Sequence, residues 1–135
     1  MISLSMMIAV ACGGAIGATL RYLVSLYVGA GVFGFSGPLA TLCVNIVGSC
    51  AMGMFACFVT GHGAVPEIWR GFFAVGLLGA LTTFSSFALD AGTLWQRQGL
   101  LMAGGYVTLS VILSLFAFAL GCWILRYSGG RRDYW

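Results

Sequence analysis

Four long apolar stretches separated by short polar links dominate the pattern along the chain. They cover roughly 4–27, 39–60, 71–95 and 100–125. Each has at least the roughly 20 mostly apolar residues that a helix needs to cross a bilayer. Short links make sequential helices antiparallel neighbours. We therefore expect an all-α membrane protein, with residues 1–135 forming a single domain of four transmembrane helices.

Composition and charge support lipid as the solvent. The chain is 61% hydrophobic and 7% charged, with a mean hydropathy of +1.04, whereas a soluble domain carries about 25% charged residues. All six basic residues are arginines, and they are scattered, so no basic stripe indicates nucleic acid. The first of them, Arg21, lies in the last third of the first stretch, so no basic residue precedes the apolar run and we expect no cleavable signal peptide.

The arginines also bear on orientation. Four spans place both termini on one side of the membrane. Arg21 and Arg97 belong to the opposite side, and the other four arginines belong to the side of the termini. Basic residues near span ends set orientation, so four against two is a weak bias. The sequence therefore specifies its orientation poorly, which is tolerable if both orientations are used.

Polar side chains inside the apolar stretches are the candidates for function, because a polar group in hydrocarbon is costly without a partner. Two rows recur every four residues, on the second and fourth stretches: Thr41, Asn45 and Ser49, and Tyr106, Ser110 and Ser114. These groups are uncharged and can donate hydrogen bonds, so an aligned row can solvate an anion stepwise. Hydrogen bonding between helices is the alternative for any single one.

The third stretch has an unusual centre, G-A-L-T-T-F-S-S-F, from Gly79 to Phe87. Glycine and threonine weaken a helix, so we expect a break near the bilayer midplane. Irregular backbone is tolerated there only where it is buried or lines a cavity, and its free carbonyls can bind a cation. Phe84 and Phe87 share one face, and their positive ring edges can line an anion path.

These motifs resemble the Fluc fluoride channels. The segment 79–87 is similar to that family's G-G-L-T-T-F-S-T-F signature, with Ala80 and Ser86 as small departures. Residues 17–22 resemble its G-A-x-x-R-[YW] motif and residues 41–49 its T-L-x-V-N-x-x-G-[SA] motif. The row on the fourth stretch matches Y-x-x-x-S-x-x-x-S, and Asp90 replaces a frequent glutamate. The likeness covers all four stretches in order.

The resemblance implies a passive, fluoride-selective channel that exports fluoride across the bacterial inner membrane. It also implies an antiparallel, dual-topology homodimer with two pores, embedded in lipid. A structural sodium ion at the dimer interface would be held by the backbone carbonyls of Gly79 and Thr82. The candidate residues of the anion pathway are Arg21, Thr41, Asn45, Thr83, Phe84, Ser85, Phe87, Asp90, Tyr106, Ser110 and Ser114.

Two other classes of protein compete. A small proton-coupled drug exporter is also four-helical, but needs a membrane-embedded carboxylate; the first stretch has none, and Asp90 lies near the end of the third. A membrane enzyme such as a thiol oxidase needs paired cysteines or a cluster of His and carboxylates. The five cysteines form no C-x-x-C pair, and we expect them to be small packing residues. We expect no enzyme and keep the exporter as the alternative.

Overall fold

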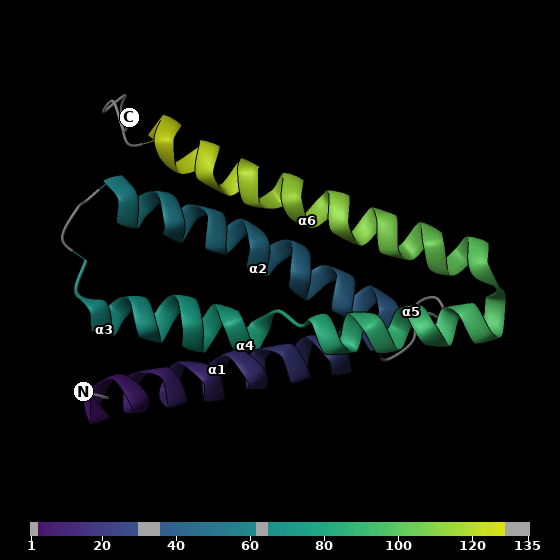
Figure 1. Ribbon diagram of the computed structural model, residues 1–135, viewed down its shortest axis with the longest axis horizontal. Helices are drawn as coiled ribbons and strands as arrows, with labels where there is room; N and C mark the ends of the chain where they lie inside the picture. The colour runs from purple at the N-terminus through teal and green to yellow at the C-terminus, as the bar shows by residue number, and fades with distance from the viewer. Residues whose placement is uncertain (1–2, 30–35, 62–64, 129–135) are drawn as a thin grey trace.

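The computed structural model describes residues 3–29, 36–61 and 65–128, and these are helical almost throughout. Figure 1 shows the order of the helices along the chain. Three are continuous: α1 (Leu4–Gly29), α2 (Ser36–Gly61) and α6 (Leu100–Ser128). Between α2 and α6 lies a composite region of four segments: α3 (Glu67–Arg70), the π-helix η1 (Gly71–Leu78), α4 (Gly79–Leu81) and α5 (Phe84–Gln98). Within the described residues, these make four regions long and apolar enough to cross a membrane.

The links between helices differ from the sequence expectation. Residues 67–70, expected in the second link, form α3, and residues 96–98, expected in the third, extend α5. Gly99 alone therefore joins α5 to α6, with φ of 89°, which glycine adopts without steric cost. Its N–H donates to the Trp95 carbonyl at 3.0 Å and closes α5. Pro38, expected in the first link, lies in the first turn of α2, where a missing N–H costs nothing.

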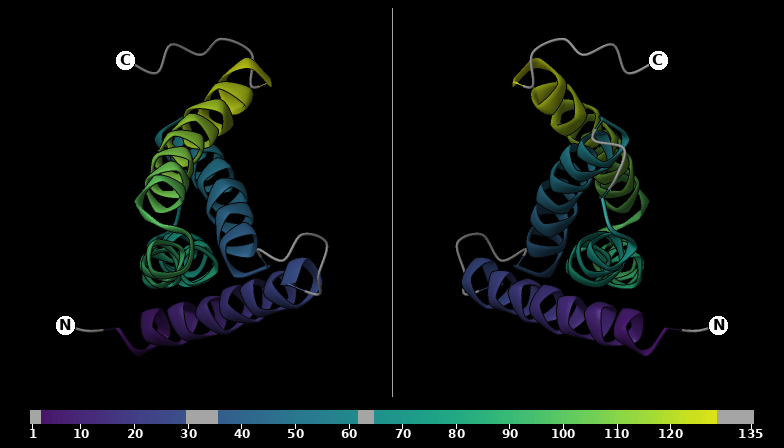
Figure 2. Two further views of the ribbon diagram at one scale, coloured as in Figure 1. Left: turned by 90° about the vertical axis from the view of Figure 1, so that its right-hand side faces the viewer. Right: turned by 90° about the vertical axis from the view of Figure 1, so that its left-hand side faces the viewer.

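Glycines allow α1 to pack on η1 and α4 with backbone against backbone. A Cβ added to Gly13 would collide with the Phe72 carbonyl, and one added to Gly17 with the Leu77 carbonyl. Gly14, one position along from Gly13, faces open space. Small residues drive helix association in lipid because close approach maximises van der Waals contact. The first span is therefore held against the first half of the composite region, as the end-on views in Figure 2 show.

A second close pair is formed by α2 and α6. A Cβ on Gly53 would collide with the Phe118 carbonyl, and one on Gly121 with the Cys50 carbonyl. The same approach brings Cys57 and Cys122 into disulfide contact, with Cα atoms 5.4 Å apart. The expectation that all five cysteines are packing residues is therefore wrong for these two, because helix contact pairs residues that lie 65 positions apart.

The surface of the chain suits lipid. Large apolar side chains such as Leu101, 88% exposed, cover the outside of the helices. Exposed aromatic residues lie toward both ends, with Trp69 and Trp123 at one end and Tyr27 and Trp95 at the other. Trp and Tyr prefer the two membrane–water interfaces. The start of α1 and the end of α6 lie at the same end (Figure 1), as an even number of spans requires.

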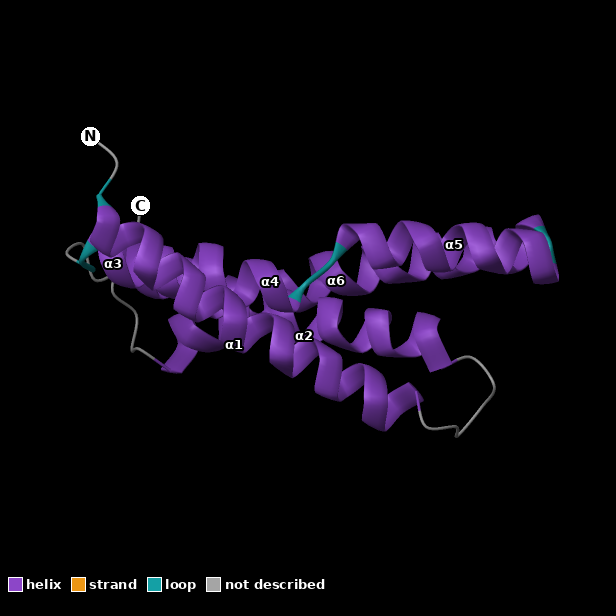
Figure 3. Ribbon diagram, turned by 90° about the horizontal axis from the view of Figure 1, so that it is seen from below, coloured by secondary structure: helices purple, strands orange, loops and turns teal. Residues whose placement is uncertain are grey.

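The composite region is interrupted between α4 and α5. Thr82 and Thr83 have extended backbone, with ψ of 154° and 125°. Figure 3 shows this interruption as a short loop between two helices that otherwise continue one another. Two residues thus separate a half that packs on α1 from a half that packs on α6.

Candidate functional site

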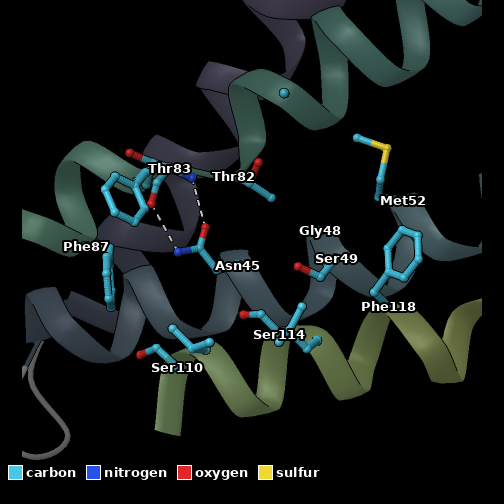
Figure 4. Close-up of a pocket in the computed structure, with 14 residues that line it drawn as sticks. Asn45, Gly48, Ser49, Met52, Thr82, Thr83, Phe87, Ser110, Ser114 and Phe118 are labelled. Atoms are coloured by element: carbon cyan, nitrogen blue, oxygen red, sulfur yellow. Dashed lines mark hydrogen bonds between the residues drawn. The ribbon is translucent and has the colours of Figure 1, made fainter. Parts of the chain in front are cut away.

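The interruption at Thr82 and Thr83 is stabilised by a side chain from another helix. The Thr83 N–H donates to Asn45 Oδ1 at 2.8 Å, and Asn45 Nδ2 donates to the Thr83 carbonyl at 3.1 Å. Both bonds are drawn in Figure 4. One amide of α2 thereby takes the place of the helical partners that the extended backbone has given up.

Two backbone N–H groups near the interruption donate to side chains and no longer donate to the carbonyls that they would meet in a continuous helix. In a continuous helix the Thr83 N–H would donate to Gly79, but it donates to Asn45. The Ser86 N–H would donate to Thr82, but it donates to Thr83 Oγ1 at 3.2 Å, which caps α5. The carbonyls of Gly79 and Thr82 are therefore both deprived of their regular helical donors.

An open cavity of about 480 Å³ lies beside this interruption, between α2, α6 and the composite region. Figure 4 shows side chains from all three around it. Eight of the predicted site residues line it: Asn45, Gly79, Thr82, Thr83, Phe84, Phe87, Ser110 and Ser114. Polar groups from helices far apart in sequence thus converge on one space with mostly apolar walls.

The serine row of α6 forms one side of this cavity. Ser110 is only 4% exposed, and its hydroxyl has no hydrogen-bond partner among the described residues. Ser114, one turn further, is partly exposed and lines the same space. A buried hydroxyl without a partner costs about 1–3 kcal/mol. Ser110 therefore holds an unused donor in the wall of the cavity.

The two phenylalanines play different parts in the single chain. Phe87 is buried, and its ring lies 5.5 Å from that of Tyr106 between centroids. Phe84 is 79% exposed, although its ring centroid lies only 5.3 Å from that of Phe87. The rings form a chain from the cavity toward Tyr106, with Phe84 at its open end.

A second group of predicted residues does not line the cavity. Thr41 is buried, and Tyr106 donates from its hydroxyl to Asp90 Oδ2 at 3.5 Å. Asp90 Oδ1 also lies close to Gly37 in the first turn of α2, where the helix dipole favours negative charge. The Tyr106 hydroxyl is therefore a hydrogen-bond partner of the Asp90 carboxylate.

The remaining two candidates lie apart from the polar wall. The Ser85 hydroxyl is exposed and lies 3.2 Å from Thr83 Oγ1, so it extends the cap of α5. Arg21 is partly exposed on α1, which contributes no residue to the cavity. The structure therefore brings neither residue into the lining of the cavity.

Several lining residues were not among the candidates. Met52 lies on the Asn45 face of α2 at i+7, beside Ser49 of the predicted row, and Phe118 continues the serine row of α6 at i+4. Helical periodicity was the signal that could have found them. Met52 and Phe118 were not predicted, because both are apolar and the prediction rested on polar side chains.

Comparison with known proteins identifies the family. Residues 8–122 match the family described as CrcB-like protein, Camphor Resistance (CrcB). The chain belongs to the CrcB-like family. A relative named fluoride-specific ion channel FluC, from Mesorhizobium japonicum, is 44% identical over 87% of this chain and 93% of its own length. A relative of the same name from Paramagnetospirillum magneticum is 48% identical over 83% of this CrcB-like chain and 88% of its own length. Another, from Vibrio cholerae, is 41% identical over 87% of this chain and 93% of its own length.

Proposed function

We propose that this CrcB-like protein is the subunit of a passive, fluoride-selective channel that exports fluoride across the plasma membrane and lowers its cytoplasmic concentration. The observation that carries the proposal is the buried Ser110 hydroxyl, which lacks a partner among the described residues and lines a cavity between spans. The family of the chain and the names of its relatives support the same function. A channel of this kind does no covalent chemistry, so the protein is not an enzyme.

Selectivity for fluoride follows from the kinds of group around the cavity. Fluoride is small and strongly hydrated, so a pore must replace its water with donors at close range. Hydroxyls of Ser110 and Ser114 are such donors, and one N–H of the Asn45 amide remains after its bond to Thr83. The ring edges of Phe84 and Phe87 add partial positive charge. Ring walls also keep the path narrow, which disfavours the larger chloride ion.

The alternative function, proton-coupled drug export, lacks support. It requires a carboxylate that exchanges a proton for a cationic drug inside the membrane. Asp90 is the carboxylate of α5, and it does not line the cavity but lies beside Tyr106 and the start of α2. The relatives reported above are named as channels.

The working unit that we propose is an antiparallel homodimer with two pores. One chain leaves its cavity open along one side, and it leaves Phe84 79% exposed. A second copy in the opposite orientation would complete the wall and cover that ring. The weak arginine bias favours insertion both ways. In this dimer the interruption at Thr82 and Thr83 lies near the bilayer midplane, where irregular backbone must face protein or a cavity.

A structural sodium ion fits the same assembly. The carbonyls of Gly79 and Thr82 have lost their regular helical donors to Asn45 and to the Thr83 hydroxyl. Carbonyl oxygens of this kind are suitable ligands for a hard cation. Two-fold symmetry would double two carbonyls to four. When bound, the ion supplies a fixed positive charge that favours anions nearby.

Fluoride efflux from liposomes tests the main proposal. Purified protein is reconstituted into liposomes loaded with potassium fluoride, and efflux is followed with a fluoride electrode after valinomycin is added. Fast fluoride efflux with no chloride efflux from matched liposomes is expected. Equal rates for the two anions, or no efflux from vesicles shown to contain folded protein, would refute fluoride selectivity.

Orientation and sodium are tested separately. Single engineered cysteines, in a chain cleared of its natural ones, should be labelled from both sides of whole cells; labelling from one side only would refute the antiparallel dimer. For sodium, Gly79→Leu should abolish efflux, because the new side chain crowds the carbonyls. Thr82→Ser keeps the backbone and the hydroxyl and should stay near the parent rate. Unchanged efflux in Gly79→Leu would place the ion elsewhere.

A further inference from the structure

The contact between α2 and α6 ends in a pair of cysteines that the proposed channel function does not use. Gly53 and Gly121 bring the two backbones together, and Cys57 and Cys122 follow with Cα atoms 5.4 Å apart. That separation lies within the range of about 4.4–6.8 Å found in protein disulfides. The glycine contact thus holds the two cysteines at bonding range without backbone movement.

The pair differs from the other cysteines of the chain. Cys12, Cys43 and Cys50 are free thiols. Cys50 and Cys57 lie seven residues apart on α2, yet only Cys57 faces a cysteine of α6. A thiol used only for packing has no need of a second thiol opposite it. Pairing between two spans is the feature that indicates a covalent link.

The position of the pair makes it reachable from the membrane surface. Cys57 lies four residues before Gly61, where α2 ends, and Cys122 lies six residues before Ser128, where α6 ends. At 1.5 Å per residue, these are about 6 and 9 Å from the helix ends. Cys57 is 8% exposed and Cys122 is partly exposed, so small reagents reach Cys122 first.

We propose that Cys57 and Cys122 are a reversible modification site, at which a small disulfide compound forms the link between α2 and α6 and a small thiol compound, itself oxidised to the disulfide, breaks it. In the forward direction, the Cys122 thiolate attacks the small disulfide, forms a mixed disulfide and expels one thiol. The Cys57 thiol then attacks the Cys122 sulfur and expels the second thiol. The two cysteines lose two electrons and two protons, and the small disulfide gains them to become two thiols.

The link joins the two helices that form one wall of the cavity. Ser49 and Met52 on α2 and Ser114 and Phe118 on α6 line the cavity, and Cys57 and Cys122 lie within two turns of Met52 and Phe118 on the same helices. Oxidation therefore fixes the spacing of this wall at one end. Reduction leaves that spacing to the glycine contact alone.

In the proposed antiparallel dimer, on which this step rests, the two identical pairs lie at opposite membrane surfaces. The cytoplasmic side is reducing, and the extracytoplasmic side is oxidising. One copy would then carry the disulfide and the other would carry two thiols. A homodimer of identical chains would in this way become chemically asymmetric.

Counting modified cysteines tests the site without measuring fluoride. Reduced, purified protein is treated with dithiodipyridine, freed of reagent, denatured and alkylated with N-ethylmaleimide, and adducts of both kinds are counted by intact mass spectrometry. The parent has five cysteines, so a disulfide leaves three adducts. Cys57→Ser should carry four. The matched control Cys50→Ser keeps the pair and should carry two. Five adducts on the parent would overturn the proposal.

Two further measurements complete the test. The unfolding temperature of the parent and of Cys50→Ser should fall on reduction, and that of Cys57→Ser should not change; equal shifts in all three would contradict a link between α2 and α6. In cells quenched with acid and alkylated, the parent should give two populations, with three and five adducts, in similar amounts. A single population would refute the opposite placement of the two copies, whatever the fluoride assay shows.

Discussion

The two halves of the composite third region differ in what they contact and in what they carry. The half before the interruption, η1 and α4, packs on α1 through glycines and carries apolar side chains. The half after it, α5, packs on α6 and carries Phe87, Asp90 and the hydroxyl cap. One span thus combines an anchor with a functional segment. The interruption therefore separates a half that anchors the span from a half that carries the functional side chains. Substitutions in the two halves should therefore impair the protein in different ways.

The largest effect is expected in the anchor. Gly17→Ala places a Cβ against the Leu77 carbonyl, and backbone cannot move aside cheaply, so we expect a loss of about 3 kcal/mol of stability. The matched control Gly14→Ala adds the same methyl group into open space and should behave as the parent. Size-exclusion chromatography and thermal unfolding measure the difference. Equal behaviour of the two variants would refute the close contact.

The next effect is expected at the amide that stabilises the interruption. Asn45→Asp keeps the acceptor for the Thr83 N–H but removes the donor to the Thr83 carbonyl and adds a negative charge beside the proposed anion path. Leaving a buried acceptor unpaired costs about 1–3 kcal/mol. We expect fluoride efflux to fall about 100-fold. Parent-like efflux from this variant would show that the amide is not part of the pathway.

A smaller effect on transport, without an effect on the fold, is expected at Phe84. The ring is 79% exposed in the single chain, so Phe84→Ile should change the stability of the chain by no more than about 0.5 kcal/mol. Loss of the ring edge should slow fluoride efflux about tenfold. Phe84→Met should be milder, because its sulfur is polarizable. If Phe84→Ile conducts at the parent rate as an assembled dimer, the ring only packs.

The smallest effect is expected at the cap of α5. Thr83→Val removes the hydroxyl that accepts from the Ser86 N–H, which should cost about 1 kcal/mol. Thr83→Ser keeps the hydroxyl and serves as the control. Thermal unfolding should separate the two variants by a few degrees, with the valine variant lower. An equal unfolding temperature would mean that water or another group caps the helix.

The four spans could be predicted, because the length of an apolar stretch is enough to identify a helix that crosses lipid. Local chemistry near Thr82 and Thr83 also pointed to an irregular backbone, since glycine and threonine weaken helices. The rows of Asn45 and of Ser110 were visible because a period of four marks one helix face. Helix breaks and rows on one helix face depend on local sequence, so they can be predicted from a single sequence.

Other features could not be predicted because they depend on contacts across the chain. The Asn45–Thr83 bonds join residues 38 positions apart, and Cys57 and Cys122 are 65 apart. The π-helix from Gly71 to Leu78 has no sequence rule of its own. Arg21 was grouped with the pathway by resemblance, but its helix contributes nothing to the cavity.

The bonds between Asn45 and Thr83 have a consequence for biogenesis. A chain enters the membrane from its N-terminus, so the span that carries Asn45 reaches the bilayer before the span that carries Thr83. The amide that satisfies the extended backbone is thus already in place when that backbone arrives. If the order of the two spans were reversed by circular permutation, the extended segment would enter lipid first, with its peptide groups unpaired at a cost of several kcal/mol each. The order of the spans along the gene therefore spares the nascent chain this exposure.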